Sequence, residues 1–211
     1  YLFGITLALG GVLAGPSAGW QADLQGIAVY GVMTIAMMLV ASWLCEKVLL
    51  PRFNNTKEVV EDQNLGTAFV EAGVHIANGL ILLAIQQGSG AWWIGVVFWA
   101  LAQVALMVVG LVYEKATTHS IHDELERDNA AVGLAFAGVL VGMGNIISLA
   151  VAGDFTSWKD SLITFGADVA FGLVILLVIK RLTDVVLAPG VSLAAQQTQE
   201  KPQIGAGLLE A

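Results

Sequence analysis

Residues 61–73 read EDQNLGTAFVEAG, and residues 126–138 read ERDNAAVGLAFAG. Both stretches begin with an acid, carry an asparagine three residues later and end in Ala-Gly. Residues 200–211 read EKPQIGAGLLEA, which repeats the initial acid and the Gly- and Ala-rich continuation. Recurrence of one pattern along a chain indicates several copies of one structural unit. We therefore predict a fold built from repeated units.

The composition places these units in a membrane. Of the 211 residues, 57% are hydrophobic and only 12% are charged, whereas an ordinary soluble domain carries about 25% charged residues. The apolar residues form runs of roughly 20, the length that an α-helix needs to cross a bilayer. We predict an all-α integral membrane protein in contact with the lipid bilayer. The net charge of −8 argues against a nucleic-acid partner.

The apolar residues separate into six segments and the start of a seventh. The segments cover residues 1–14, 24–50, 66–85, 91–113, 130–151 and 162–182, and the seventh begins near Ile204. This pattern predicts a helical bundle with about six full or partial crossings plus the start of a seventh. Because Tyr1 opens inside one apolar run and Ala211 stops inside another, we expect the chain to be part of a longer protein.

The repeat unit is a helix, a charged loop, a second helix and a short turn. The helices that enter the charged loops end with the acids Glu46, Glu114 and Asp184. Residues 1–23 hold the second helix of a preceding copy, 24–90 and 91–160 each hold a complete two-helix copy, and 161–211 hold the first helix, loop and start of the second helix of a further copy. Since each copy crosses twice, all copies share one orientation.

Loop charge predicts that orientation. Eight of the nine basic residues lie in the longer connections: Lys47, Arg52, Lys57, Lys115, Arg127, Lys180, Arg181 and Lys201. Only Lys159 lies on the other side, where Trp20, Trp92, Trp93 and Trp158 fall at the helix ends. Cytoplasmic loops carry an excess of Lys and Arg, and tryptophans mark membrane interfaces. We expect the charged loops near residues 47–62, 115–128 and 180–201 to be cytoplasmic.

The acidic helix end, the loop and the E-x-x-N/Q opening into an Ala/Gly-rich helix resemble the YjfL-like bacterial inner-membrane family, also called domain of unknown function 350. The resemblance covers essentially the whole chain as tandem copies. It implies a multi-pass protein of the bacterial inner membrane and brings no established activity. The third copy departs from the pattern, because Gln203 stands at the position of Asn64 and Asn129.

Several polar residues fall inside the apolar segments. Glu71 lies two turns into its helix, and His75 and Asn78 follow on the same face. Glu210 repeats Glu71 in the last copy, and Asp168 is the other intramembrane acid. Such residues mark proton or ion routes in transporters, so Glu71, His75, Asn78, Asp168 and Glu210 are a candidate polar path. The alternative is a buried network that only fixes helix packing.

The repeated loop residues form a second candidate set. It comprises Glu46, Glu61, Asn64, Glu114, Glu126, Asn129, Asp184 and Glu200. Acids just before a helix favour the positive end of its dipole, and asparagine is a preferred N-cap. We expect these residues to stabilise helix ends. The alternative is a partner or ligand surface made by the clustered loops.

The sequence favours a protein that is not an enzyme. It shows no phosphate loop, metalloprotease helix or serine-nucleophile elbow, and we predict no catalytic residue, metal site or cofactor. The first hypothesis is a structural or partner subunit that associates with itself or with other membrane subunits. The second is a proton or small-cation channel or secondary transporter that uses the buried acids.

Overall fold

The computed structural model describes residues 1–14, 17–51, 54, 57–88, 90–187 and 189–211, and within these ranges the regular structure is helical throughout. The apolar helices are α1 (Leu2–Leu13), α2 (Trp20–Leu49), α3 (Leu65–Gln87), α4 (Trp92–Ala116), α6 (Ala130–Val151), α7 (Trp158–Leu182) and α9 (Ile204–Glu210). The loops contain the short helices α5 (Ile121–Glu126) and α8 (Leu193–Thr198) and the π-helical turns η1 (Lys57–Glu61) and η2 (Thr183–Leu187).

Every predicted apolar segment forms a helix. Five of the described helices are long and apolar enough to cross a membrane, namely α2, α3, α4, α6, and α7 continued to Val186, and α1 is a shorter apolar helix. The prediction of an all-α membrane protein built from helical hairpins is therefore confirmed. Helix α7 begins earlier than predicted, at Trp158, because the Ser157 hydroxyl accepts a hydrogen bond from the backbone N–H of Asp160 and caps the first turn.

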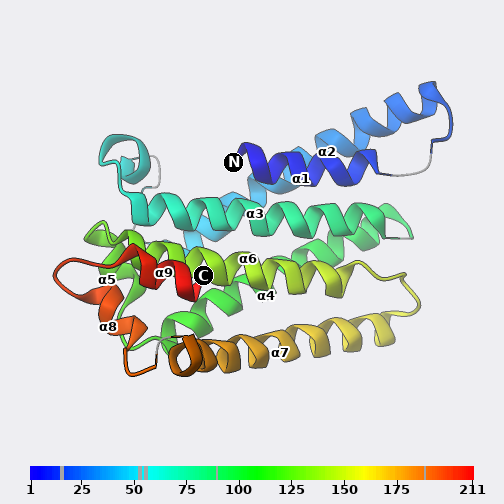
Figure 1. Ribbon diagram of the computed structural model, residues 1–211. Coiled ribbons are helices and arrows are strands. Elements are labelled where there is room, and N and C mark those ends of the chain that lie inside the picture. Colours follow the sequence, from blue (N-terminus) through cyan, green and yellow to red (C-terminus); the bar gives the residue numbers. More distant parts are fainter. Residues whose placement is uncertain (15–16, 52–53, 55–56, 89, 188) are drawn as a thin grey trace.

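The helices form two layers (Figure 1). The second helices of the hairpins, α1, α3, α6 and α9, lie side by side in one row, and the closest packing in the molecule joins each helix of this row to the next. The first helices, α2, α4 and α7, run in the opposite direction and pack against the row. We call the end of the bundle with the long connections the loop side and the opposite end the turn side. Every helix of the row runs from the loop side to the turn side.

The row is held together by backbone contact. A Cβ atom on Gly133 of α6 would collide with the backbone of Gly66 in α3, and one on Gly73 would lie 2.8 Å from the Cα of Ala137. Between α1 and α3, a Cβ on Gly79 would collide with the backbone of Gly4. Small residues of this kind allow helices to approach closely in lipid, where hydrophobic burial does not drive association. Larger apolar side chains fill the space between the two layers.

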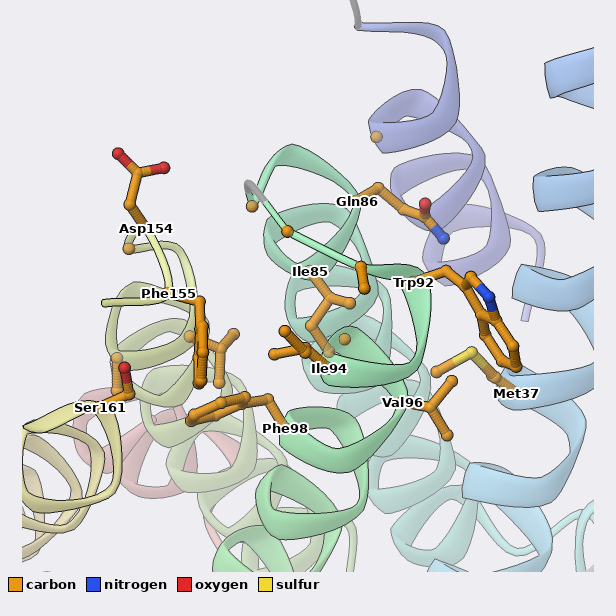
Figure 2. Close-up of a pocket in the computed structure, with 18 of the residues that line it drawn as sticks. Met37, Ile85, Gln86, Trp92, Ile94, Val96, Phe98, Asp154, Phe155 and Ser161 are labelled. Carbon is orange, nitrogen blue, oxygen red and sulfur yellow. The ribbon is translucent and has the colours of Figure 1, made fainter. Parts of the chain in front are cut away.

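A cavity of about 480 Å³ opens at the turn side (Figure 2). Residues from the ends of α1, α3 and α6 and from the starts of α4 and α7 line it, together with residues from α2. Glu71, His75 and Asp168 do not line this cavity. It therefore lies apart from the polar residues that the sequence singled out.

We predict that Gly133→Ala destabilises the protein by about 1–3 kcal/mol, the usual cost of forcing extra atoms into a packed core. The added methyl group would meet the backbone of Gly66, which cannot move without shifting α3. Thermal unfolding in detergent measures the effect. Gly142→Ala in the same helix is the matched control, because nothing beyond the adjoining backbone of its own helix lies within 4 Å of its Cβ position. Equal melting temperatures for the two variants would contradict the backbone contact.

Candidate functional site

The repeated asparagines cap helices of the row, as the sequence predicts. The Asn64 side-chain oxygen accepts a hydrogen bond from the N–H of Thr67 at 2.9 Å. The Asn129 oxygen accepts from Ala131 and Val132 at 3.1 and 3.2 Å. Both asparagines are buried, with 4% and 2% of their surface exposed. Each therefore satisfies backbone N–H groups that a helix leaves without an internal partner.

The same asparagines also join one copy to the next, which sequence reasoning missed. The Asn64 amide donates to the carbonyl of Leu125 at 2.7 Å, in the loop of the following copy. The Asn129 amide donates to the carbonyl of Gln197 at 2.8 Å, again in the following loop. Asn129 also donates to a Glu124 carboxylate oxygen at 2.6 Å. The recurring asparagine is thus a joint between neighbouring repeats as well as a cap.

The acids of the repeat pattern have different environments. Glu61, Glu126 and Glu200 are exposed at the loop side, whereas Glu46 and Asp184 are half-buried. Glu114 has a defined structural role, because both of its carboxylate oxygens accept from the N–H of Ile121, at 3.2 and 3.1 Å, at the start of α5. At the third copy Gln203 precedes α9 without a side-chain capping bond. The acids of the pattern therefore have no common structural role.

Helix α5 is tied to the bundle by His122. Its Nδ1 lies 3.4 Å from a Glu114 carboxylate oxygen, and its Nε2 lies 2.9 Å from the carbonyl oxygen of Leu49 at the end of α2. The ring therefore joins α4, α5 and α2 at the loop side. In the same loop His119 is half-buried, and burial lowers the pKa of His119 below its ordinary value.

The polar residues of α3 have two different sets of partners. The Nδ1 atom of His75 lies 2.6 Å from the backbone oxygen of Glu71 and 3.6 Å from its carboxylate. The Asn78 amide donates to the carbonyl of Val74 at 3.0 Å and lies 3.7 Å from the sulfur of Cys45 in α2. The structure therefore brings Glu71 and His75 together and directs Asn78 toward α2.

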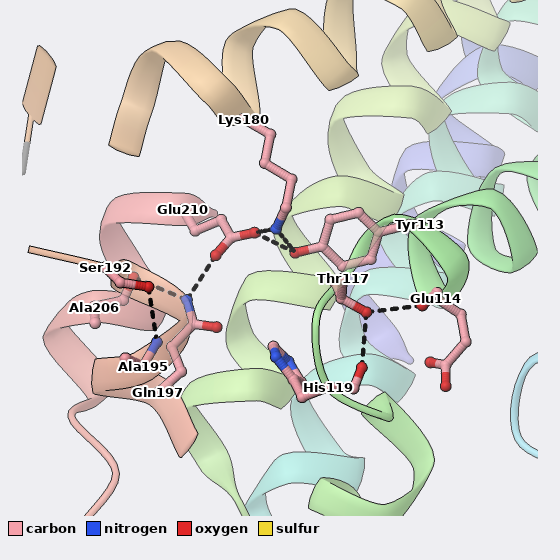
Figure 3. A network of polar contacts seen from close by, with 10 residues as sticks. All are labelled: Tyr113, Glu114, Thr117, His119, Lys180, Ser192, Ala195, Gln197, Ala206 and Glu210. Carbon is pink, nitrogen blue, oxygen red and sulfur yellow. Dashed lines mark hydrogen bonds and ion pairs between the residues drawn. The ribbon is translucent and has the colours of Figure 1, made fainter. Parts of the chain in front are cut away.

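Glu210 belongs to a different cluster (Figure 3). Its carboxylate forms an ion pair with Lys180 of α7 and accepts from the Tyr113 hydroxyl of α4 at 2.5 Å. The Gln197 amide of α8 donates to the other carboxylate oxygen at 2.7 Å. The Lys180 ammonium also lies 4.6 Å from the centre of the Tyr113 ring. This network joins four helices at the loop side.

In the middle copy an apolar residue stands at the position that is acidic in the other two copies, and its packing accounts for the difference. Phe136, which stands where the other copies have Glu71 and Glu210, stacks in parallel on Tyr113 with ring centres 5.7 Å apart. The Tyr113 ring therefore packs on the phenylalanine of the middle copy, while its hydroxyl donates a hydrogen bond to Glu210 of the next copy. Sequence reasoning found Glu210 but missed Lys180, Tyr113 and Gln197. The one available signal was a lysine close to the end of a long apolar run.

The candidate polar path does not form one chain in the structure. Asp168 lies on the exposed surface of α7, and α4 and α6 lie between α7 and α3 (Figure 1). Glu71 and His75 are in contact, Asn78 is directed toward α2, Glu210 belongs to a separate network, and Asp168 is in none of these groups. The hydropathy pattern could not reveal this, since α7 is apolar on all sides.

Taken together, the fold and these contacts define a class: an integral membrane protein made of tandem helical hairpins whose loop-side caps interlock. A family model described as Domain of Unknown Function (DUF350) matches residues 1–85 and 89–211, as two tandem copies. The chain belongs to this family, which confirms the resemblance seen in the repeated motif. The two matches meet at the turn between α3 and α4. The comparisons with curated proteins and with solved structures gave no match.

We predict that Asn129→Ala destabilises the protein by about 1–3 kcal/mol, since it removes both a helix cap and a buried inter-repeat hydrogen bond. Amide hydrogen exchange should accelerate at Ala131 and Val132, whose N–H groups lose their acceptor. Gln203→Ala is the control, because the Gln203 side chain forms no cap bond. Comparable stability losses in the two variants would show that the asparagine is not a joint.

We predict that Lys180→Met costs about 3–5 kcal/mol of stability, because it leaves the Glu210 carboxylate buried without its cation. Adding Glu210→Gln in the same chain should restore most of the loss, since no buried charge then remains. Thermal unfolding in detergent compares the single and double variants. Arg181→Met, at the exposed neighbouring position, should change stability little. A double variant as unstable as Lys180→Met would refute the pairing.

Proposed function

We propose that this protein is a non-enzymatic module of a membrane assembly and that it binds another membrane-protein surface through the exposed face of α7. The observation that carries the proposal is the position of Asp168. It lies roughly 15 Å from the start of α7 at 1.5 Å per residue, which is near the middle of the helix. There it is exposed on the surface of the bundle.

A carboxylate in this position is costly if lipid surrounds it. Placing an aspartate at the centre of a membrane helix costs about 2.5–3.5 kcal/mol on insertion scales, and intramembrane acids almost always face protein or water. A neighbouring transmembrane helix that offers a hydrogen-bond donor or a basic side chain would remove most of this cost. The exposed carboxylate therefore favours a covering partner.

The surroundings of Asp168 also suit a protein contact. Between residues 164 and 170 the exposed side chains are all small or polar: Thr164, Gly166, Ala167, Asp168 and Ala170. The exposed surface of α2 is different, because it carries large apolar side chains such as Val32, Leu39 and Trp43. Small and polar residues are enriched where membrane helices meet, whereas large apolar residues suit contact with lipid. The short stretch of α7 around Asp168 thus differs from the exposed surface of α2, and large exposed apolar side chains, Ile163 and Phe171, border it on both sides.

The proposed module would lie in a bacterial inner membrane with its loop side in the cytoplasm. Among the basic residues that the structure describes, Lys47, Lys57, Lys115, Arg127, Lys180, Arg181 and Lys201 belong to the loop side and only Lys159 to the turn side. The positive-inside rule then supports this orientation, and the family resemblance supports the choice of membrane. In this orientation the clustered loops are available to cytoplasmic partners.

We predict that the protein extracted in mild detergent is part of a complex larger than the monomer. Asp168→Leu and Ala167→Trp should each raise the apparent dissociation constant by about threefold to tenfold, because an interhelical hydrogen bond or a close helix contact is lost. Mass photometry measures the complex, and intact mass distinguishes a second copy from another subunit. Val32→Trp on the exposed surface of α2 is the matched control.

The alternative is a proton or small-cation channel or transporter that uses the buried acids. A monomer that conducts protons or cations in vesicles would favour this alternative and reject the proposed module. Complex formation that is unchanged by Asp168→Leu and by Ala167→Trp would also reject the α7 interface.

A further inference from the structure

The cavity at the turn side has walls of a distinctive kind (Figure 2). Phe98 of α4 and Phe155 of the α6–α7 turn face into it, and Ile85, Ile94 and Met37 add apolar surface. Both phenylalanines are held by Trp158, which stacks on Phe98 at 6.3 Å and meets Phe155 edge-on at 5.0 Å. The aromatic wall is therefore fixed in place by its own packing.

The charge of the lining is acidic. Asp154 and Asp160 line the cavity with the hydroxyls of Ser161 and Thr164, and no basic side chain occurs among the described lining residues. The first turn of α7 fixes Asp160, whose carboxylate accepts from the Ser157 hydroxyl at 2.8 Å. Carboxylates attract a cation, and aromatic faces stabilise it through their quadrupole. The lining thus combines the two features that favour an organic ammonium group.

The volume and position of the cavity place a second requirement on the ligand, in addition to its positive charge. Its volume of about 480 Å³ falls within the usual range for a small-molecule pocket, about 300–1,000 Å³. It lies where five described helices begin or end, with Trp92 on its border, and tryptophan is typical of a membrane interface. A ligand at this depth meets water at one end and hydrocarbon at the other. The ligand should therefore be an amphiphile.

We infer that this cavity binds an amphiphile with an ammonium head group. The ammonium lies at the mouth of the cavity, beside Asp160 and against the aromatic wall, and the apolar tail follows Ile85, Ile94 and Met37. The Asp154 carboxylate points outward from this wall (Figure 2) and adds negative charge at the rim of the cavity. A membrane lipid with an ethanolamine head group and a free alkylammonium compound share this chemistry. The cavity shares Thr164 with the proposed α7 interface but does not include Asp168 or Ala167, the residues that test that interface.

The test uses the full chain in nanodiscs that contain equal amounts of phosphatidylethanolamine and phosphatidylglycerol. Native mass spectrometry counts the lipids that stay bound. We expect phosphatidylethanolamine to be retained at least about threefold over phosphatidylglycerol, in line with the strength of a cation–aromatic contact. Asp154→Asn combined with Asp160→Asn should abolish this preference. Asp23→Asn, at an acid near the turn side that does not line the cavity, is the matched control and should keep it.

A second measurement separates the two sources of the ligand. Octyltrimethylammonium is titrated into phosphatidylcholine nanodiscs while tryptophan fluorescence is recorded. Saturable binding that Phe155→Leu weakens about threefold supports ammonium recognition, since leucine keeps apolar volume but removes the aromatic face. Retention of phosphatidylethanolamine without octyltrimethylammonium binding identifies a lipid site. If neither probe is preferred, or if both aspartate substitutions leave the preference unchanged, the inference is overturned.

Discussion

The whole structure depends on the contact between the backbones of the row helices. At Gly133 and Gly66 two helices approach so closely that not even a methyl group fits between them. This approach confines the sides of α3 and α6 that face each other to very small residues, so bulky apolar side chains must point to the second layer or to lipid. The helices α2, α4 and α7 are therefore needed to cover the row, and each hairpin supplies one of them. The two-layer architecture follows from the size limit at one interface.

The loop-side hydrogen bonds fix the register of this row. The Asn64 and Asn129 amides each hold a carbonyl of the following loop, so each helix starts at a set level relative to its neighbour. This alignment places Glu210 of α9 opposite Tyr113 and Lys180. It also places Phe136, at the corresponding position of α6, against the Tyr113 ring. The same alignment of the helices therefore underlies both the asparagine caps and the ion pair between Lys180 and Glu210.

The sequence predicts what depends on local pattern. Hydropathy finds the helices because a bilayer sets their length, and the E-x-x-N pattern finds the caps of α3 and α6 because a cap is formed within one turn. The sequence does not predict the pairing of Glu210 with Lys180, since these residues come from separate helices and the loop between them has no periodic hydropathy pattern. It also does not show which way Asp168 points, because α7 is apolar all round and offers no amphipathic face. The sequence does not predict the cavity either, since its walls come from six different helices and the turns between them.

The arrangement of the row has a consequence for how such a protein can change its length. Each row helix makes its main contacts with the helix before it and the helix after it, so the free energy of the array is close to a sum of nearest-neighbour contributions. If one whole hairpin were duplicated or lost, the row helices on either side of the change would pack through the same kind of helix surface as before. Chains with different numbers of hairpins could share one architecture, and selection could act on a single copy, such as the one with Phe136, while the others stay unchanged.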